Sequence, residues 1–289
     1  MADHQEEFYG KESINGSKEQ RVGNGSSHLE ELKRTATNIT LTPDQFEKLY
    51  LSPQNRVSGD LRKTVGNPTP LALIGFLMCL TPLSCDLMGW RGAGGSGAAG
   101  TASYFFFGGL LMVLGGTLEF LLGNTFPFVV FSSFGAFWLS YGGTLQPFYN
   151  AAGAYAGGDQ AAGLTTPGFS NSFAFFLLFM GFMCFIYMIA ALRTNIVFFL
   201  IFMTLVCALT LLAGAFWQVG QGNPTLGVRL QIAGGAFGFV TCMLGWYIFT
   251  AQILASVDFP LNLPIGDLST VFKSGRERRS TKEKSSDSA

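Results

Sequence analysis

The sequence predicts an all-α polytopic membrane protein in which six transmembrane helices form a pore. Long apolar stretches recur along the chain, and residues 64–257 contain only six charged side chains. A soluble domain of this size would carry charge on about a quarter of its residues. A helix needs about 20 apolar residues to cross a hydrocarbon core, and six stretches meet that length. They are Leu71–Trp90, Ser103–Leu122, Pro127–Leu145, Ser172–Leu192, Ile196–Trp217 and Leu230–Ser256.

Composition divides the chain into three parts. Residues 1–64 form a mostly disordered tail, because a segment rich in Ser, Gly, Glu and Lys buries too little apolar surface to order itself. Within that tail, residues 42–51 predict a short amphipathic helix that begins with a sequence resembling a capping box. Residues 65–268 form the six-helix membrane domain. Residues 269–289 form a basic, Ser-rich tail that is solvated or accepts phosphate.

The distribution of Lys and Arg predicts the orientation in the membrane. With the N-terminus inside, basic residues cluster on the cytoplasmic flanks, whereas the outer loops hold only Arg91 and Arg229. We therefore expect both termini in the cytoplasm. The polar start of the chain lacks the apolar segment of a signal peptide, so we expect the first span to act as the targeting signal. The balanced net charge indicates no nucleic-acid partner.

Residues suited to catalysis or metal binding are scarce. The five cysteines lie one by one inside predicted spans, without CxxC spacing and without a histidine in the same region. They are interpreted as packing residues. Acidic residues within the spans are too few to build a metal site, and no nucleotide-binding or hydrolase motif is present. We expect no enzyme, no metal and no cofactor.

The turn before the first span is the strongest candidate for a binding site. Asn67, Pro68, Thr69, Pro70 and Leu71 lead from a polar segment directly into apolar sequence. A capping Asn with prolines suited to a first helical turn predicts free backbone N–H groups at the positive end of a helix dipole. Such an end attracts anions. Plain helix initiation is the alternative interpretation of the same residues.

Two acidic residues lie near span ends and are candidates for a proton site. Asp86 falls near the outer end of the first span, and Glu119 near the inner end of the second. Intramembrane ionisable groups are often functional, but groups at an interface are less so. Glu119 precedes a very short inner turn, and this favours a structural brace over a proton relay. Glycines such as Gly234 and Gly238 predict close helix contacts.

Several motifs occur together and in one order along the chain. They are Asn67–Phe76, Leu118–Phe120 with Gly123–Phe126, Phe134–Ser140 and Leu263–Asp267. This combination resembles the acetate uptake transporter family, which includes bacterial acetate/succinate permeases, fungal acetate permeases and ammonia-export-associated proteins. The resemblance covers about residues 62–268 and leaves out both tails.

The resemblance implies a six-helix protomer with its own pore, assembled as a ring-shaped hexamer. It implies a hydrophobic pore constriction at Phe76, Phe134 and Leu205, with acetate bound near the Asn67–Leu71 turn and along polar patches on either side of the constriction. The implied function is plasma-membrane transport of acetate and other short monocarboxylates, coupled to protons. The chain departs from the family where Thr69 replaces Ala or Gly, and where Phe134 replaces the Tyr of many bacterial members.

Two alternatives from other functional classes stay open. An ammonium or ammonia exporter would need no anion-attracting helix end. A non-transporting membrane sensor or regulator of acetate adaptation would signal through its tails.

Overall fold

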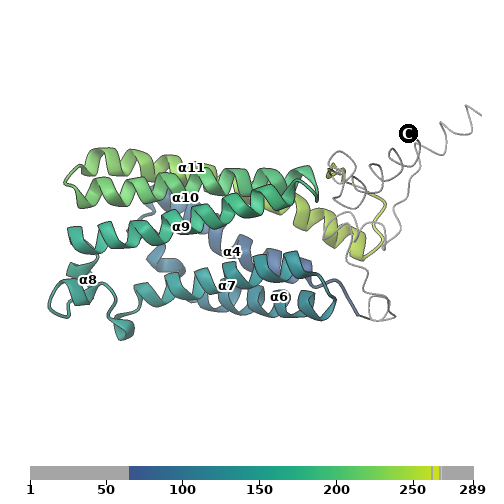
Figure 1. Ribbon diagram of the computed structural model, residues 1–289, viewed down its shortest axis with the longest axis horizontal. Coiled ribbons are helices and arrows are strands. Elements are labelled where there is room, and N and C mark those ends of the chain that lie inside the picture. The colour runs from purple at the N-terminus through teal and green to yellow at the C-terminus, as the bar shows by residue number, and fades with distance from the viewer. Residues whose placement is uncertain (1–64, 262, 267, 269–289) are drawn as a thin grey trace, which may run out of the picture. The chain divides into compact units, whose positions relative to one another are not determined.

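The structure is a computed structural model that describes residues 65–261, 263–266 and 268 (Figure 1). The predicted tails at 1–64 and 269–289, with the predicted helix at 42–51, lie outside the described residues. The described part is helical throughout its spans, and no strand occurs in it. The all-α prediction is therefore confirmed for this part of the chain.

Six segments are long and apolar enough to cross a membrane, as the sequence predicted. The predicted spans and the observed ones match in number and order, but several helices begin earlier than expected. α9 and α11 begin at proline, which suits a first helical turn because its missing N–H would have no partner there. The six segments are α4 (Thr69–Leu87), the composite span Gly95–Leu121, α7 (Thr125–Leu145), α9 (Pro167–Ala191), α10 (Ile196–Gly220) and α11 (Pro224–Ser256).

The second span is not a uniform α-helix. It consists of η2 (Gly95–Gly100), α5 (Thr101–Ser103), η3 (Tyr104–Leu111), which is a π-helix, and α6 (Met112–Leu121). π-helical turns are often found at functional sites. The remaining short elements lie in the connections and are η1 (Trp90–Gly92), η4 (Pro147–Tyr149), η5 (Gly153–Tyr155) and α8 (Gln160–Gly163).

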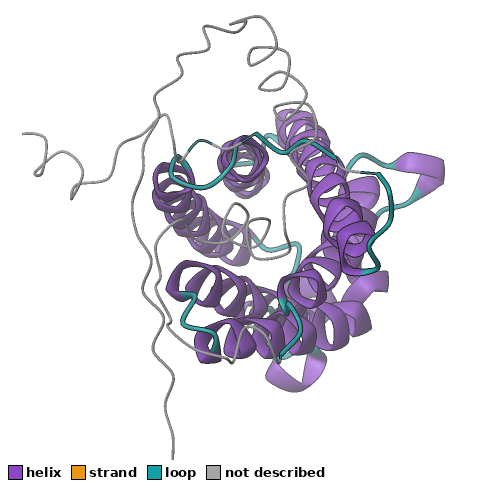
Figure 2. Ribbon diagram, turned by 90° about the vertical axis from the view of Figure 1, so that its right-hand side faces the viewer, coloured by secondary structure: helices purple, strands orange, loops and turns teal. Residues whose placement is uncertain are grey.

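The six spans form a ring of neighbours. Viewed close to end-on, their helices surround a central region (Figure 2). Backbone neighbours run in the order α9, α10, α11, α4, α6 and α7. Aromatic side chains close the ring between α7 and α9, where Phe137 stacks on Phe176 with ring centroids 5.8 Å apart. The centre of the ring is therefore bordered by all six spans.

Small residues bring α11 close to α4, as the glycine spacing predicted. A Cβ atom added at Gly238 would lie 2.8 Å from Ser84 Oγ, and one added at Gly245 would lie 2.7 Å from Leu77 Cδ2. A larger residue at either position would have to displace the Ser84 or Leu77 side chain. The two glycines thus allow α11 to lie close to α4.

The spans alternate in direction, so the ring has two distinct ends. The tail end holds the start of α4 and the end of α11, and it also holds the turn between α6 and α7. At this end the backbone N–H of Ile196 donates to the carbonyl oxygen of Gly266 at 2.9 Å. The loop end holds the connection between α4 and α5, the long connection between α7 and α9, and the turn between α10 and α11.

Candidate functional site

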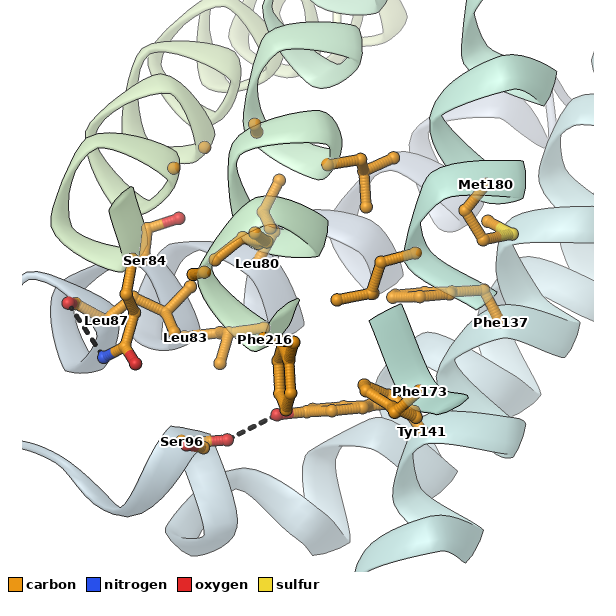
Figure 3. A pocket seen from close by; sticks show the side chains of 18 of the residues that line it. Leu80, Leu83, Ser84, Leu87, Ser96, Phe137, Tyr141, Phe173, Met180 and Phe216 are labelled. Carbon is orange, nitrogen blue, oxygen red and sulfur yellow. Dashed lines mark hydrogen bonds between the residues drawn. The ribbon is translucent and has the colours of Figure 1, made fainter. Parts of the chain in front are cut away.

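A cavity of about 220 Å³ lies in the loop-end half of the ring (Figure 3). We call it the loop-end cavity. Its walls come from α4, α7, α9, α10 and α11, and most of its lining side chains are apolar or aromatic. Aromatic residues dominate the wall formed by α7 and α9, where Phe137, Tyr141 and Phe173 lie close together (Figure 3). The space is large compared with the roughly 30 Å³ that one water occupies in the liquid.

A second, smaller cavity of about 30 Å³ lies toward the tail end. We call it the tail-end cavity. It is lined by apolar side chains and by Gly245, and Leu73, Phe198 and Phe202 are among them. A cavity of this size and lining has room for about one water but offers it no polar partner, so it is expected to stay dry.

Three residues line both cavities and lie between them: Phe76 on α4, Phe134 on α7 and Leu205 on α10. Their side chains are 7%, 4% and 4% exposed, respectively. Phe76 and Phe134 meet edge to face, with ring centroids 5.8 Å apart and planes at 78°. Offset and edge-to-face contacts are the favoured geometries for aromatic pairs. The three residues that the family resemblance assigned to a constriction are thus brought together from three different helices.

The walls of the loop-end cavity include a few residues with polar side chains among the apolar ones. Ser84 Oγ and Trp138 Nε1 are buried and have no hydrogen-bond partner within the described residues, although both residues line the cavity. Gln231 also lines the cavity, and its Nε2 donates weakly to the carbonyl oxygen of Leu87 at 3.4 Å. Both atoms are themselves buried, so neither is open to the cavity, and an unpaired buried donor costs about 1–3 kcal/mol. The cavity therefore suits a small molecule with a substantial apolar part.

The predicted free amides at the start of α4 are not found, which corrects one expectation from the sequence. The side-chain Oδ1 of Asn67 accepts a hydrogen bond from the backbone N–H of Thr69 at 3.0 Å. The N–H of Leu71 donates to the carbonyl oxygen of Pro68 at 3.0 Å, and the two prolines have no N–H to offer. The cap and the first turn therefore use the groups that were expected to receive an anion.

The turn at Asn67 still presents one polar group to the outside. Asn67 is exposed, and its Oδ1 is the side-chain atom that accepts from the backbone N–H of Thr69, which leaves its amide NH₂ group without a hydrogen bond in that contact. Asn67, Pro68, Thr69, Pro70 and Leu71 are not among the residues that line the two cavities. The turn thus lies beyond the tail-end cavity rather than within it.

Glu119 joins three segments at the tail end. Its side chain is 0% exposed, and it accepts hydrogen bonds from the Thr69 hydroxyl and from Asn124 Nδ2, the latter at 2.6 Å. Thr69 begins α4, Glu119 lies in the last turn of α6, and Asn124 directly precedes α7. These contacts hold the start of α4 against the turn between α6 and α7. Such an arrangement is what a structural brace requires.

Asp86 and the cysteines lie apart from the passage. Asp86 is half-buried in the last turn of α4 and is not among the residues lining either cavity. The five cysteines are free, and three of them are buried. Within the described residues, no group of three or more His, Cys, Asp or Glu side chains could hold a metal ion.

Sequence reasoning missed most of the wall of the loop-end cavity. Phe137, Trp138 and Tyr141 line it beside the predicted Phe134, and all four lie on α7. Their spacing of i, i+3, i+4 and i+7 marks one face of a helix. That spacing was available in the sequence, but α7 is apolar around most of its circumference, so the spacing alone does not identify the face directed at the centre.

The ring of apolar spans and its two cavities define a multi-pass membrane protein built around a narrow passage, which is the architecture of a channel or transporter. Residues 51–270 match the GPR1/FUN34/yaaH family, and the chain belongs to that family. The resemblance derived from the sequence motifs is thereby confirmed.

Curated relatives carry three kinds of name. Protein alcS of Aspergillus fumigatus is 49% identical over 81% of this chain and 86% of its own length. Acetate transporter protein patA of Aspergillus clavatus is 34% identical over 74% of this chain and 83% of its own length. Ammonia transport outward protein 2 of Saccharomyces cerevisiae is 26% identical over 90% of this chain and 94% of its own length. The family therefore includes proteins named for acetate and proteins named for ammonia.

A solved structure shares the fold. The bacterial acetate channel SatP matches with a TM-score of 0.56 and 24% identity, over 70% of this chain and 99% of that chain. The match covers nearly all of SatP but only 70% of the present chain, so the present chain is longer than the fold that the two proteins share.

Proposed function

We propose that the protein carries acetate and other short monocarboxylates across the plasma membrane through the centre of the ring. The observation that carries this proposal is that Phe76, Phe134 and Leu205 line both cavities. A passenger moving from one cavity to the other would pass these side chains. The name of the relative patA, an acetate transporter, supports acetate as the passenger.

The two cavities suit the two halves of a short monocarboxylate. In this proposal Ser84 and Gln231, which lie in the wall of the loop-end cavity, turn their side chains to donate hydrogen bonds to a carboxylate there. The apolar side chains at the constriction fit a methyl or short alkyl group and exclude water and hydrated ions. The constriction thereby favours a small passenger that loses little hydration free energy on leaving water. The undissociated acid loses less hydration free energy than the anion.

We propose that transport is coupled to protons. Moving an anion into a cell against an inside-negative potential costs about 2.3 kcal/mol per charge per 100 mV, whereas moving the anion together with one proton is electrically neutral. Glu119 and Asp86 are the intramembrane acids that sequence reasoning named for this role. The hydrogen bonds of Glu119 to Thr69 and Asn124 favour a brace for that residue.

In this proposal both termini are cytoplasmic, so the tail end faces the cytoplasm and the loop end faces outward. Asn67 lies at the cytoplasmic entrance, where its exposed amide, rather than the backbone N–H groups, meets the carboxylate. We further propose that six protomers assemble as a ring-shaped hexamer, each with its own passage. Exposed aromatic and aliphatic side chains on the outer faces of α6 and α9 would contact lipid or neighbouring protomers.

An ammonium or ammonia exporter is the second candidate, favoured by the name of the relative in Saccharomyces cerevisiae. An apolar constriction would also admit neutral ammonia. The two candidates differ in what they require of the loop-end cavity, because a carboxylate needs hydrogen-bond donors and an ammonium ion needs acceptors, and the hydroxyl of Ser84 can supply either.

Purified protein in liposomes tests the proposal. Entry of labelled acetate is measured with and without an imposed inward proton gradient, with methylammonium as a parallel tracer and empty liposomes as the control for leakage of acetic acid. Protein-dependent acetate entry that rises with the gradient supports proton-coupled transport, and equal entry without it supports a channel. Methylammonium movement alone would favour the exporter, and movement of neither tracer would contradict transport.

A further inference from the structure

A short segment of the first loop borders the outer mouth of the loop-end cavity. This segment, Gly95–Gly97, is here called the strap. Ser96 is exposed and lines the cavity, while the next residue, Gly97, is buried. In Figure 3 the strap residue Ser96 lies next to Tyr141, and a dashed line marks the hydrogen bond between them. The strap therefore forms part of the cavity wall, on the side that faces outward in the proposed orientation.

Two tyrosine hydroxyls hold the strap by its backbone. The Tyr141 hydroxyl donates to the carbonyl oxygen of Ser96, and the Tyr104 hydroxyl donates to the carbonyl oxygen of Gly97 at 2.8 Å. The two rings also contact each other, with centroids 5.1 Å apart. Tyr104 comes from η3 and Tyr141 from α7, so the strap is tied to two separate spans at consecutive residues.

The conformation of the strap depends on these contacts. Gly95, Ser96 and Gly97 all have positive φ, at 71°, 52° and 77°. For a residue with a side chain, such as Ser96, this region is unfavourable and persists only where the surroundings impose it. A Cβ atom at Gly97 would overlap the Tyr104 hydroxyl and Leu83 Cδ1, so the strap packs against both tyrosine and cavity wall.

The rest of the loop is much less closely packed. A Cβ atom added at Gly92, Gly94 or Gly95 would find no other atom within 4 Å. Glycine also gives the backbone wide conformational freedom at these positions. The strap is therefore held by two hydrogen bonds and by the packing of Gly97, whereas the glycines before it are loosely packed, and breaking the two hydrogen bonds would weaken its attachment.

We propose that the strap sets the width of the outer mouth, and that Tyr141 and Tyr104 are positioning residues that keep it in place. With the strap held, the mouth admits short monocarboxylates and disfavours longer ones. With it released, the mouth widens and discrimination by chain length falls. The choice of monocarboxylates as passengers rests on the proposed function, but the position of the strap does not.

The accessibility of the cavity to a thiol reagent tests the strap without any transport. Ser170 lines the loop-end cavity and is 2% exposed, so Ser170→Cys places a thiol of nearly the same size inside it. The two native cysteines that are only partly buried, Cys85 and Cys207, are replaced by serine in the full chain. A charged methanethiosulfonate reagent is then added from the outer side, and the rate of modification is measured.

Tyr141→Phe and Tyr104→Phe keep the rings and remove only the hydroxyls that hold the strap. Each is expected to raise the rate of modification several-fold, and together about tenfold or more, in line with the loss of one or two net hydrogen bonds. Gly97→Ala should raise the rate by an independent route, because its Cβ displaces the strap from Tyr104 and Leu83. Tyr149→Phe is the matched control, since Tyr149 is exposed and its hydroxyl bonds to no described residue.

Unchanged modification rates in both tyrosine variants and in Gly97→Ala, in protein that elutes as the native oligomer, would overturn the proposal. So would an equal rise in Tyr149→Phe. A second measurement follows uptake of butyrate relative to acetate, and the ratio is expected to rise in the Tyr141→Phe and Tyr104→Phe proteins. If the native protein moves no monocarboxylate, the proposed function fails while the labelling result still decides the strap.

Discussion

Phe76 and Phe134 meet edge to face with ring centroids 5.8 Å apart, and each ring borders the loop-end cavity on one side and the tail-end cavity on the other. The two rings come from helices that are far apart in the sequence, and Leu205 completes the group from a third. In the proposed function these three side chains form a constriction that resists water, because they have no polar atoms to replace lost hydrogen bonds.

Phe134→Ala is expected to widen the passage and reduce its selectivity. Removing the ring joins the two cavities, so larger monocarboxylates and water should cross more readily, and leakage of small ions should rise above that of the native protein. Flux of acetate, butyrate and a small inorganic anion in liposomes measures the change. The cost in stability of removing a buried Phe is about 3–5 kcal/mol, so folded protein has to be verified before flux is compared.

Phe131→Ala provides the matched control for that variant. Phe131 is equally buried on the same helix, but it lines only the tail-end cavity. Its removal should cost a similar amount of stability and leave selectivity close to that of the native protein. Equal loss of selectivity in both variants would show that Phe134 has no special position in the passage.

The sequence was sufficient for the spans but not for their ends. Length and hydropathy identified six crossings because each stretch is long enough to cross the bilayer and nearly uncharged. The starts of α9 and α11 were placed too late, since polar residues near Pro167 and Pro224 lower the local hydropathy although proline favours a helix start there. Hydropathy describes the apolar centre of a helix better than its first turns.

Contacts between distant residues explain what sequence reasoning could not reach. The backbone N–H groups that were expected to be free after Asn67 are paired, because Asn67 Oδ1 and the carbonyl oxygen of Pro68 accept hydrogen bonds from them. The grouping of Phe76, Phe134 and Leu205 came from family resemblance, since no local pattern links three separate helices. The hydrogen bond from the Tyr141 hydroxyl to the Ser96 carbonyl oxygen joins residues 45 apart in the sequence, and no local pattern in either segment predicts it.

Glu119→Gln is expected to weaken the brace at the tail end while leaving the pH dependence of uptake in place. The neutral amide can accept from one neighbour, but its NH₂ group then faces the other donor. A loss of about 1–3 kcal/mol in stability follows from one unsatisfied buried group. Thermal unfolding in detergent measures the stability, and acetate uptake at several external pH values measures the coupling.

Thr69→Val separates the brace from a proton relay. It removes the hydroxyl that donates to Glu119 and changes no ionisable group. A brace predicts a similar loss of stability in Thr69→Val and Glu119→Gln, with uptake in both still stimulated by external acid. Loss of that stimulation in Glu119→Gln alone would assign Glu119 to proton coupling instead.

Asn67→Asp is expected to lower acetate uptake strongly without lowering stability. Asp retains an oxygen that can accept from the Thr69 N–H and so preserves the cap, but it places a negative charge where the carboxylate is proposed to pass. Asn67→Ser is the control, because Ser also caps a helix and adds no charge. Uptake at equal surface expression that is unchanged in Asn67→Asp would remove the Asn67 turn from the proposed pathway.

Removing residues 1–60 and 275–289 is expected to leave most acetate uptake intact. The two cavities are lined by residues of all six spans, all of which the truncated chain retains. Uptake is measured in cells at matched surface levels, alongside any response of those cells to acetate that depends on the protein. If uptake survives and the response is lost, the tails regulate a transporter. If cells with the full chain respond to acetate but take up none, and truncation abolishes that response, the protein is a sensor. The helical ring then does not transport acetate, although its cavities suggest that it does.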